Sequence, residues 1–236
     1  MDEIKGDPIG AAILDYAATK KPNDIIVGSD ICEDDIIPIE VLFRKYDEMP
    51  ELEQVAIEKS KGKVLDVGAG TGVHSLELQD RGIEVFPIDV SEGAVTYMKK
   101  AGLNPRKIDF FDLKNEKYDT ILMMMNGIGI AGKLSNLEHT LQHAKSLLND
   151  GGKILCDSSD IKYLYEDEDG SLWVDLNSEY YGNFRFQMKY KQEKGPWFDW
   201  LYVDFENLFT AANNVGLKAK RIFEGDDHYL AEITID

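Results

Sequence analysis

The sequence predicts an α/β fold: a doubly wound, mostly parallel sheet with an N-terminal helical cap and an inserted antiparallel hairpin. From Lys63 onward, short apolar runs alternate with helical segments through Gly-rich turns, which is the pattern of βαβ units. After Asp160 this alternation stops. Two runs with period-two patterning follow, Asn183–Lys191 and Pro196–Phe205, and the turn between them is typical of an antiparallel hairpin.

The first 62 residues form the predicted helical cap. Ile9–Thr19 and Glu51–Lys59 have helical patterning, and Pro50 is well placed at the start of the second helix. The segment Ser29–Arg44 between them mixes acidic residues with bulky apolar ones. We interpret it as a candidate cap over a pocket.

The core, residues 63–160, contains five predicted strands. Most are rich in Ile, Val, Leu or Met, as expected for strands buried on both faces. They are Lys63–Val67, Glu84–Ile88, Arg106–Ile108, Thr120–Met125 and Lys153–Asp157. The helices between them are predicted at Val73–Arg81, Glu92–Ala101 and Leu134–Asn149, the last with Asp150-Gly-Gly as its stop.

The rest of the chain consists of an aromatic insert, residues 161–205, and a C-terminal part, residues 206–236. The C-terminal part is predicted to contain a helix at Glu206–Asn214 and a hairpin formed by Leu217–Phe223 and His228–Thr234. The length of the chain suits one sizeable core with a modest accessory lobe. We therefore predict a single domain over residues 1–236.

Composition and charge narrow the classes of function. Acidic residues number 44 and basic residues 26, a formal charge of −18, which would repel nucleic acid and anionic membranes. We expect neither as a partner. The sequence shows no signal peptide and no apolar run of about 20 residues, so we expect a soluble, cytoplasmic protein. Cys32 and Cys156 lie far apart without ligand spacing, and no metal site is predicted.

The segment Val64–Gly72, Val-Leu-Asp-Val-Gly-Ala-Gly-Thr-Gly, ends a predicted strand and begins a predicted helix. Its glycines let the backbone turn tightly and let a ligand approach closely. A dinucleotide-binding fingerprint reads G-x-G-x-x-G, whereas Val73 stands here in place of the last glycine. The pattern is therefore G-x-G-x-G, which disfavours NAD.

Further candidate ligand-binding residues follow the next strands. Asp89 is placed to accept hydrogen bonds from two ribose hydroxyls. Asp109 and Phe110 offer a carboxylate for an adenine amino group and an aromatic face for its ring. Asp112 competes for the carboxylate role, and we favour Asp109. The carbonyls of Met125–Gly127 would face the same ligand, because the carboxyl ends of parallel strands share one edge of the sheet.

Residues 63–160 resemble the class I, Rossmann-like S-adenosylmethionine-dependent methyltransferases. The resemblance implies a seven-stranded sheet with a reversed C-terminal hairpin, and S-adenosyl-L-methionine as cofactor, which has no pyrophosphate to bind. The residues expected to bind it are Asp66, Gly68, Ala69, Gly70, Gly72, Asp89, Val90, Asp109, Phe110, Met125, Asn126 and Gly127. The N-terminal segment and the insert also resemble an uncharacterised bacterial group, which indicates no substrate.

No catalytic residue is predicted, because methyl transfer from a sulfonium mainly requires alignment of the reactants and exclusion of water. The chain lacks an Asn-Pro-Pro-aromatic element and any basic run, so we expect a small-molecule acceptor. The polar cluster Asp157–Asp160 is best placed to meet it. The alternatives are an NAD-dependent oxidoreductase and a non-catalytic cofactor-binding module that holds a protein partner.

Several other residues allow both a functional and an ordinary interpretation. Arg44 is either a clamp for a carboxylate of cofactor or acceptor, or a surface residue. His74 is favoured as a packing residue near the site. His139 and His143 lack a third metal ligand and are interpreted as helix surface or boundary residues. The aromatic residues between Trp173 and Tyr202 line an acceptor pocket, pack the hairpin against the core, or form a homodimer contact.

Overall fold

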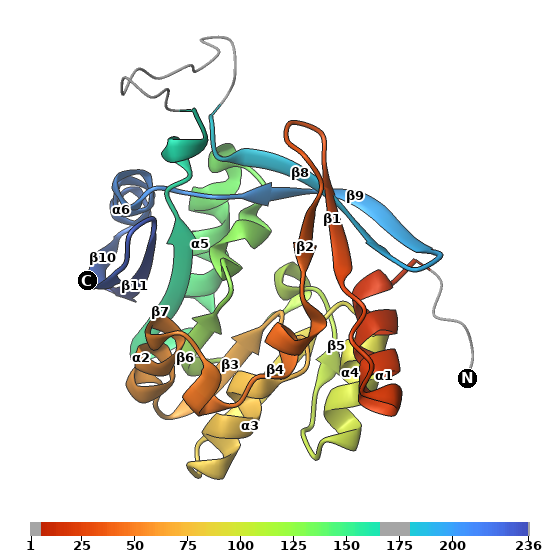
Figure 1. The fold of residues 1–236 in the computed structure, drawn as a ribbon. Coiled ribbons are helices and arrows are strands. Elements are labelled where there is room, and N and C mark those ends of the chain that lie inside the picture. Colours follow the sequence, from red (N-terminus) through yellow and green to blue (C-terminus); the bar gives the residue numbers. More distant parts are fainter. Residues whose placement is uncertain (1–5, 166–179, 236) are drawn as a thin grey trace.

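A seven-stranded sheet forms the centre of the computed structural model, which describes residues 6–165 and 180–235 (Figure 1). Its strand order is β10-β11-β7-β6-β3-β4-β5. The strands are β3 (Lys63–Val67), β4 (Glu84–Asp89), β5 (Arg106–Lys107), β6 (Tyr118–Met123), β7 (Leu148–Ser159), β10 (Leu217–Glu224) and β11 (His228–Ile235). Strands β3 to β7 pair in parallel, and β11 runs antiparallel to both β7 and β10. The predicted mostly parallel sheet with a reversed hairpin is confirmed.

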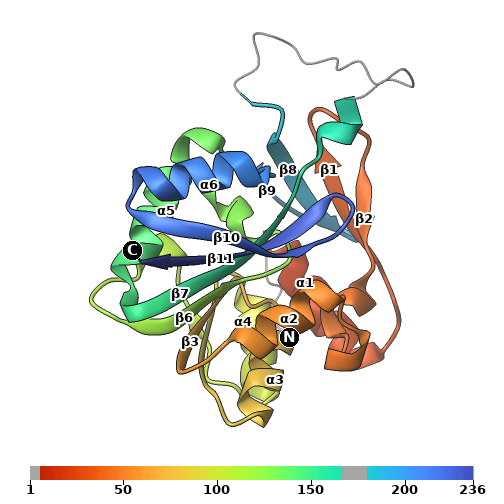
Figure 2. The ribbon, with the colours of Figure 1, turned by 90° about the vertical axis from the view of Figure 1, so that its left-hand side faces the viewer.

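Helices cover both faces of this sheet (Figure 2). One apolar cluster joins one face of the strands to α5 (Leu137–Ser146) and α6 (Phe205–Asn214). A second cluster joins the other face to α2 (Glu51–Lys59) and α3 (Val73–Asp80). The strand residues alternate between the clusters, because successive side chains of a strand point to opposite faces. Each strand therefore presents every second residue to the α2 side.

A separate antiparallel sheet with strand order β2-β1-β8-β9 lies beside the main sheet (Figure 1). Its strands are β1 (Ile25–Ser29), β2 (Asp35–Ile37), β8 (Asn183–Tyr190) and β9 (Glu193–Leu201). The inserted hairpin is thus confirmed. The N-terminal segment contains the two predicted helices, and two strands that were not predicted, β1 and β2, lie between them. Their pairing depends on β8, where Ile26 lies opposite Lys189, and this partner is far away in the sequence.

Three predicted boundaries are corrected. The strand predicted to end at Met125 ends at Met123, because Met125 and Asn126 adopt left-handed φ angles of 62° and 60°. The helix predicted to end at Asn149 ends at Ser146, and Asp150-Gly-Gly lies in the irregular start of β7. The second hairpin strand ends at Leu201, because the Asp204 carboxylate caps α6 by accepting a hydrogen bond from the Asn207 N–H at 2.9 Å.

The N-terminal helix α1 (Pro8–Thr19) packs against α4 (Glu92–Lys100) at the β4–β5 side of the main sheet (Figure 1). The Asp7 carboxylate caps α1 and also accepts hydrogen bonds from the Ser91 hydroxyl at 2.8 Å and the Gly93 N–H at 3.1 Å. Short 3₁₀ turns occur at Ile39–Phe43, Tyr46–Glu48, Phe110–Asp112, Gly127–Ala131, Leu134–Asn136 and Lys162–Tyr165. Within the described ranges, no helix has the length and apolar character needed to cross a membrane.

Candidate active site

The glycine loop after β3 has two open positions and one packed position. Gly68, Gly70 and Gly72 all have positive φ angles, 68°, 58° and 76°, which disfavour side chains. A Cβ added at Gly68 or Gly70 would meet nothing within 4 Å, whereas one at Gly72 would lie 2.5 Å from Leu103. The first two glycines therefore leave space that a ligand can enter, and Gly72 is required by packing.

Asp89, at the end of β4, is held by two backbone donors. Its carboxylate accepts hydrogen bonds from the Gly70 N–H at 2.8 Å and the Ser91 N–H at 2.8 Å. Ser91 rather than Asp89 caps α4, by accepting a hydrogen bond from the Ala94 N–H. The next residue, Val90, is 64% exposed although it is apolar. The predicted pair Asp89 and Val90 therefore lies beside the glycine loop.

The residues predicted to contact adenine differ in their exposure to solvent. Asp109 is exposed, and its carboxylate accepts a hydrogen bond from the Phe111 N–H at 2.9 Å. Phe110 is buried, with its ring packed edge-on against His143 at 4.8 Å. The ring of Phe110 thus belongs to the core rather than forming a free stacking face. Asp112 is exposed as well, so the choice between Asp109 and Asp112 stays a prediction.

The loop after β6 contacts the polar cluster at the end of β7. The Asp157 carboxylate accepts hydrogen bonds from the Asn126 N–H at 2.8 Å and the Gly127 N–H at 3.2 Å. The Ser158 hydroxyl donates to the Asn126 side-chain carbonyl at 2.9 Å and accepts from the Val203 N–H at 3.0 Å. The structure therefore brings together two regions that the sequence analysis selected separately.

A buried polar network lies between the glycine loop and the N-terminal segment. The Ser75 hydroxyl donates to Asp66 at 2.6 Å, and the His74 Nε2 lies 2.8 Å from a Glu53 carboxylate oxygen. The Arg44 guanidinium pairs with the other oxygen of Glu53, while the Arg44 Nε is buried without a hydrogen-bond partner in the described part of the chain. Arg44 is thus not a surface residue, and His74 packs near the site as favoured.

Glu53 was missed by the sequence analysis. It lies in the first turn of α2, where an acidic residue is ordinary, yet it is only 5% exposed. Burial alone would raise the pKa of Glu53, but hydrogen bonds from His74 and Arg44 hold it below its usual range. The sequence contains no signal for this role, because the three residues meet only after α2 packs on α3.

Three carboxylates at the ends of β3, β4 and β7 have raised pKa values. Burial raises the pKa of Asp66 and of Asp89, and burial raises the pKa of Asp157 to about 6. The physical cause is that a low-dielectric environment disfavours the ionised form. A cationic ligand along this edge would stabilise the ionised carboxylates.

A cavity of about 340 Å³ opens beside the β6 and β7 strand ends. It is lined by Arg44, Pro50, Leu52, Glu53, Met125, Asn126, Asp157, Ser159 and His228. Sequence analysis had selected Arg44, Met125, Asn126, Asp157 and Ser159 from this set. Pro50 had been singled out only as the start of a predicted helix. Leu52 and Glu53 lie on that helix, α2.

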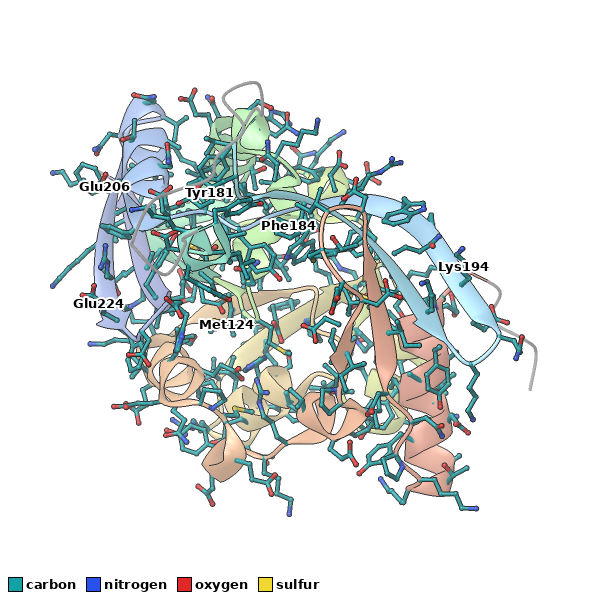
Figure 3. The ribbon with its side chains drawn as sticks, turned by 45° about the horizontal axis from the view of Figure 1, so that its top comes forward. Met124, Tyr181, Phe184, Lys194, Glu206 and Glu224 are labelled. Carbon is teal, nitrogen blue, oxygen red and sulfur yellow. The ribbon has the colours of Figure 1, made fainter. Side chains whose placement is uncertain are left out.

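Most aromatic residues in the described part of the insert pack in one cluster, Tyr180 and Tyr190 pack in two others, and none of them lines this cavity. Phe184 and Phe186 are buried in the first cluster, and Figure 3 shows Phe184 and Tyr181 above Met124, the residue after β6. Contact with the loop after β6 is made by Trp200, whose ring is so near Gly129 that a Cβ there would approach it to 2.4 Å. Trp173 lies outside the described residues.

His139 and His143, on α5, have structural contacts. His143 is hydrogen-bonded through Nε2 to the Phe110 carbonyl at 2.8 Å, and His139 stacks on Phe111 at 5.9 Å. The two side chains therefore take part in packing at the helix boundary. Within residues 6–165 and 180–235, no group of three or more His, Cys, Asp or Glu side chains is arranged to hold a metal ion.

The parallel sheet, the open glycine loop and the acidic strand ends define a class I S-adenosylmethionine-dependent methyltransferase. Residues 39–200 match the model of the family described as Methyltransferase domain, and the chain belongs to this family. An uncharacterized methyltransferase of Staphylococcus carnosus (strain TM300) is 31% identical over 217 residues, which cover 82% of this chain and 86% of that protein.

A solved structure gives the same assignment. The chain is similar to a SAM-dependent methyltransferase from Bacteroides fragilis, whose crystal structure is in complex with S-adenosyl-L-homocysteine, with 45% identity and a TM-score of 0.91. The similarity covers 98% of this chain and 95% of that chain. The predicted enzyme class and cofactor are confirmed, which favours methyl transfer over the oxidoreductase and binding-module alternatives.

Proposed function

We propose that the protein transfers the methyl group of S-adenosylmethionine to a small-molecule acceptor that binds in the cavity beside β6 and β7. The cavity carries this proposal. Its volume of about 340 Å³ falls within the range of small-ligand sites, and its walls include the Met125–Asn126 loop that adjoins the cofactor edge. Donor and acceptor would then occupy neighbouring parts of one sheet edge.

The cofactor is proposed to bind over the β3, β4 and β5 ends. Gly68 and Gly70 leave open space for it, and the exposed apolar side chain of Val90 would cover part of the adenine. Asp89 would accept hydrogen bonds from the ribose hydroxyls, with the lone pairs that its two backbone contacts leave free. Asp109 is proposed for the adenine amino group.

The methionine part of the cofactor is proposed to lie between Asp66 and the Met125–Gly127 loop. Asp66 is ionisable and close to the glycine loop, and Met125 is 38% exposed although apolar. The buried Arg44 Nε is a donor for a carboxylate of either ligand. The proposed site uses residues of the N-terminal segment, the core and the C-terminal hairpin, which supports one catalytic domain over residues 1–236.

When bound, the cofactor supplies an electrophilic methyl group on a sulfonium. The protein's part is to align the acceptor with that group and to exclude water. Asp157 fixes the Asn126–Gly127 backbone by two hydrogen bonds. The Thr71 hydroxyl, which donates to the Leu42 carbonyl, fastens the N-terminal segment over the glycine loop. These contacts support a preorganised, covered site.

Titration calorimetry and a methylation assay test the proposal. S-adenosylhomocysteine is expected to bind in the micromolar range or tighter, NAD is expected not to bind, and labelled methyl groups are expected to appear on a low-molecular-weight product. Binding of NAD without S-adenosylhomocysteine would contradict the cofactor assignment. Salt-resistant methylation of RNA or DNA would contradict the small-molecule acceptor.

A further inference from the structure

Asp157 and Glu53 both line the cavity, and they lie on two different elements, β7 and α2. Asp157 follows Cys156 on β7 and therefore points to the same face of the sheet as Leu155, which packs in the cluster with α2. Glu53 lies on α2. Both carboxylates line the cavity, and the charge of Glu53 contributes to raising the pKa of Asp157. Two carboxylates on separate elements thus line the cavity.

The two carboxylates differ in how their charge is balanced. Glu53 is paired with the Arg44 guanidinium and hydrogen-bonded to His74. Asp157 receives its hydrogen bonds from the backbone N–H groups of Asn126 and Gly127, which carry no net charge. Arg44 and His228 are the basic residues that line the cavity, and the permanent charge of Arg44 is matched by Glu53. The charge left for a ligand to balance is therefore that of Asp157.

The charge of Asp157 discriminates between classes of nucleophile. A carboxylate acceptor would be repelled, and a neutral hydroxyl acceptor would gain no ionic attraction from Asp157. An amine has the opposite property, because it arrives as an ammonium ion and is attracted.

We propose that the acceptor is a small primary or secondary amine that binds in the cavity with its ammonium group against Asp157. This inference rests on the proposed function and specifies its substrate class. An ammonium proton passes to the Asp157 carboxylate, and the freed nitrogen lone pair forms the N–C bond to the methyl carbon. The C–S bond breaks with its electron pair going to sulfur, so the sulfonium becomes a neutral thioether. The proton leaves Asp157 for solvent on product release.

Matched substrate pairs test the amine. S-adenosylhomocysteine formation is measured with glycine and glycolate, benzylamine and benzyl alcohol, cyclohexylamine and cyclohexanol, and glucosamine and glucose, each at about 10 mM. The amine of at least one pair is expected to react at least about tenfold faster than its hydroxyl partner. Preference for a hydroxyl partner, or no reaction of any amine in the panel, would overturn the assignment.

The role of Asp157 is tested by Asp157→Asn, with Asp150→Asn as the matched control on the exposed start of the same strand. For the best amine, Asp157→Asn is expected to lower kcat/KM by about 100-fold or more, the usual size of a lost proton-transfer group, while Asp150→Asn leaves it unchanged. A loss of less than about threefold in Asp157→Asn would overturn the role of Asp157.

Binding of S-adenosylhomocysteine to each preparation separates the possible failures. If it does not bind to the wild-type protein, the proposed function fails. If it binds normally and the amines do not react, the amine assignment alone fails. The wild-type substrate preference needs no variant, so the amine assignment stays falsifiable even if Asp157→Asn does not fold.

Discussion

The two halves of the sheet edge are built in different ways. The half over β3, β4 and β5 takes most of its proposed cofactor contacts from one stretch of chain, Asp66 to Asp109, in which the acidic residues lie within two positions of a strand end. The half over β6, β7 and β11 takes its cavity from Arg44, Glu53, Asn126, Asp157 and His228, which lie on separate elements. The residues proposed to bind the methyl donor therefore lie mostly close together in the sequence. Those proposed to bind the methyl acceptor are brought together only by tertiary packing. Changes in one half should largely spare the other.

The largest expected effect is on the cofactor half. Asp89→Ala should weaken S-adenosylhomocysteine binding about a hundredfold, because two hydrogen bonds to a charged acceptor would be lost, each contributing about 1.5–3 kcal/mol at most. Titration calorimetry measures the change in Kd. Asp80→Ala, at an exposed position at the end of α3, serves as the control and should change Kd less than threefold. Equal affinities in wild type and Asp89→Ala would contradict the assignment of this half.

Gly129→Ala should damage the acceptor half through packing. The added Cβ would lie 2.4 Å from the Trp200 ring and 2.9 Å from the Leu201 carbonyl oxygen, so one of these groups must move. Overpacking of this kind costs about 2–3 kcal/mol. Urea unfolding measures the loss, and S-adenosylhomocysteine affinity at low temperature should change less than threefold. An affinity loss larger than that would show that the two halves are coupled.

Asp157 should make stability depend on pH. Its pKa is about 6 in the folded chain and 3.8 in the reference state. Because the folded value is the higher one, the stabilisation is complete below pH 3.8 and is lost as pH rises through 6. Relative to wild type, Asp157→Asn should therefore gain about 2 kcal/mol between about pH 4.5 and 7.5.

Urea unfolding at both pH values measures this difference, and Asp150→Asn provides the control. A stability difference between Asp157→Asn and wild type that stays constant over the pH range would show that burial does not control the Asp157 carboxyl. The acceptor half would then carry no cost of burying a charge in the absence of ligand.

The smallest expected effect is at Asp7, which links helix α1 to the turn after Asp89 in the cofactor half. Asp7→Ala removes the cap of α1 and its hydrogen bonds to Ser91 and Gly93. The loss should be about 1 kcal/mol, or a fall in Tm of about 2–4 °C for a chain of this size. Asp24→Ala at an exposed position is the control. A tenfold loss of S-adenosylhomocysteine affinity in Asp7→Ala would show that α1 positions the Asp89 turn directly.

Prediction from sequence succeeded where the signal was local. Helix α2 was predicted with its observed bounds, and the glycine loop was placed between a strand and a helix. A predicted boundary was wrong where the backbone conformation ended a strand although the apolar side-chain pattern continued. Met124 and Met125 continue an apolar run, yet the left-handed φ of Met125 and Asn126 ends β6 before them.

The sequence by itself determined the fold class, the cofactor class and the edge of the sheet where binding is expected. These follow from short-range patterns, because a strand, a glycine turn and an acidic residue occupy adjacent positions in the chain. Only the tertiary structure decided that β1 and β2 join the inserted hairpin, and that Arg44, Glu53 and Asp157 surround one cavity. The reason is that the charge balance and burial of these side chains arise from contacts between distant segments, which no local pattern encodes.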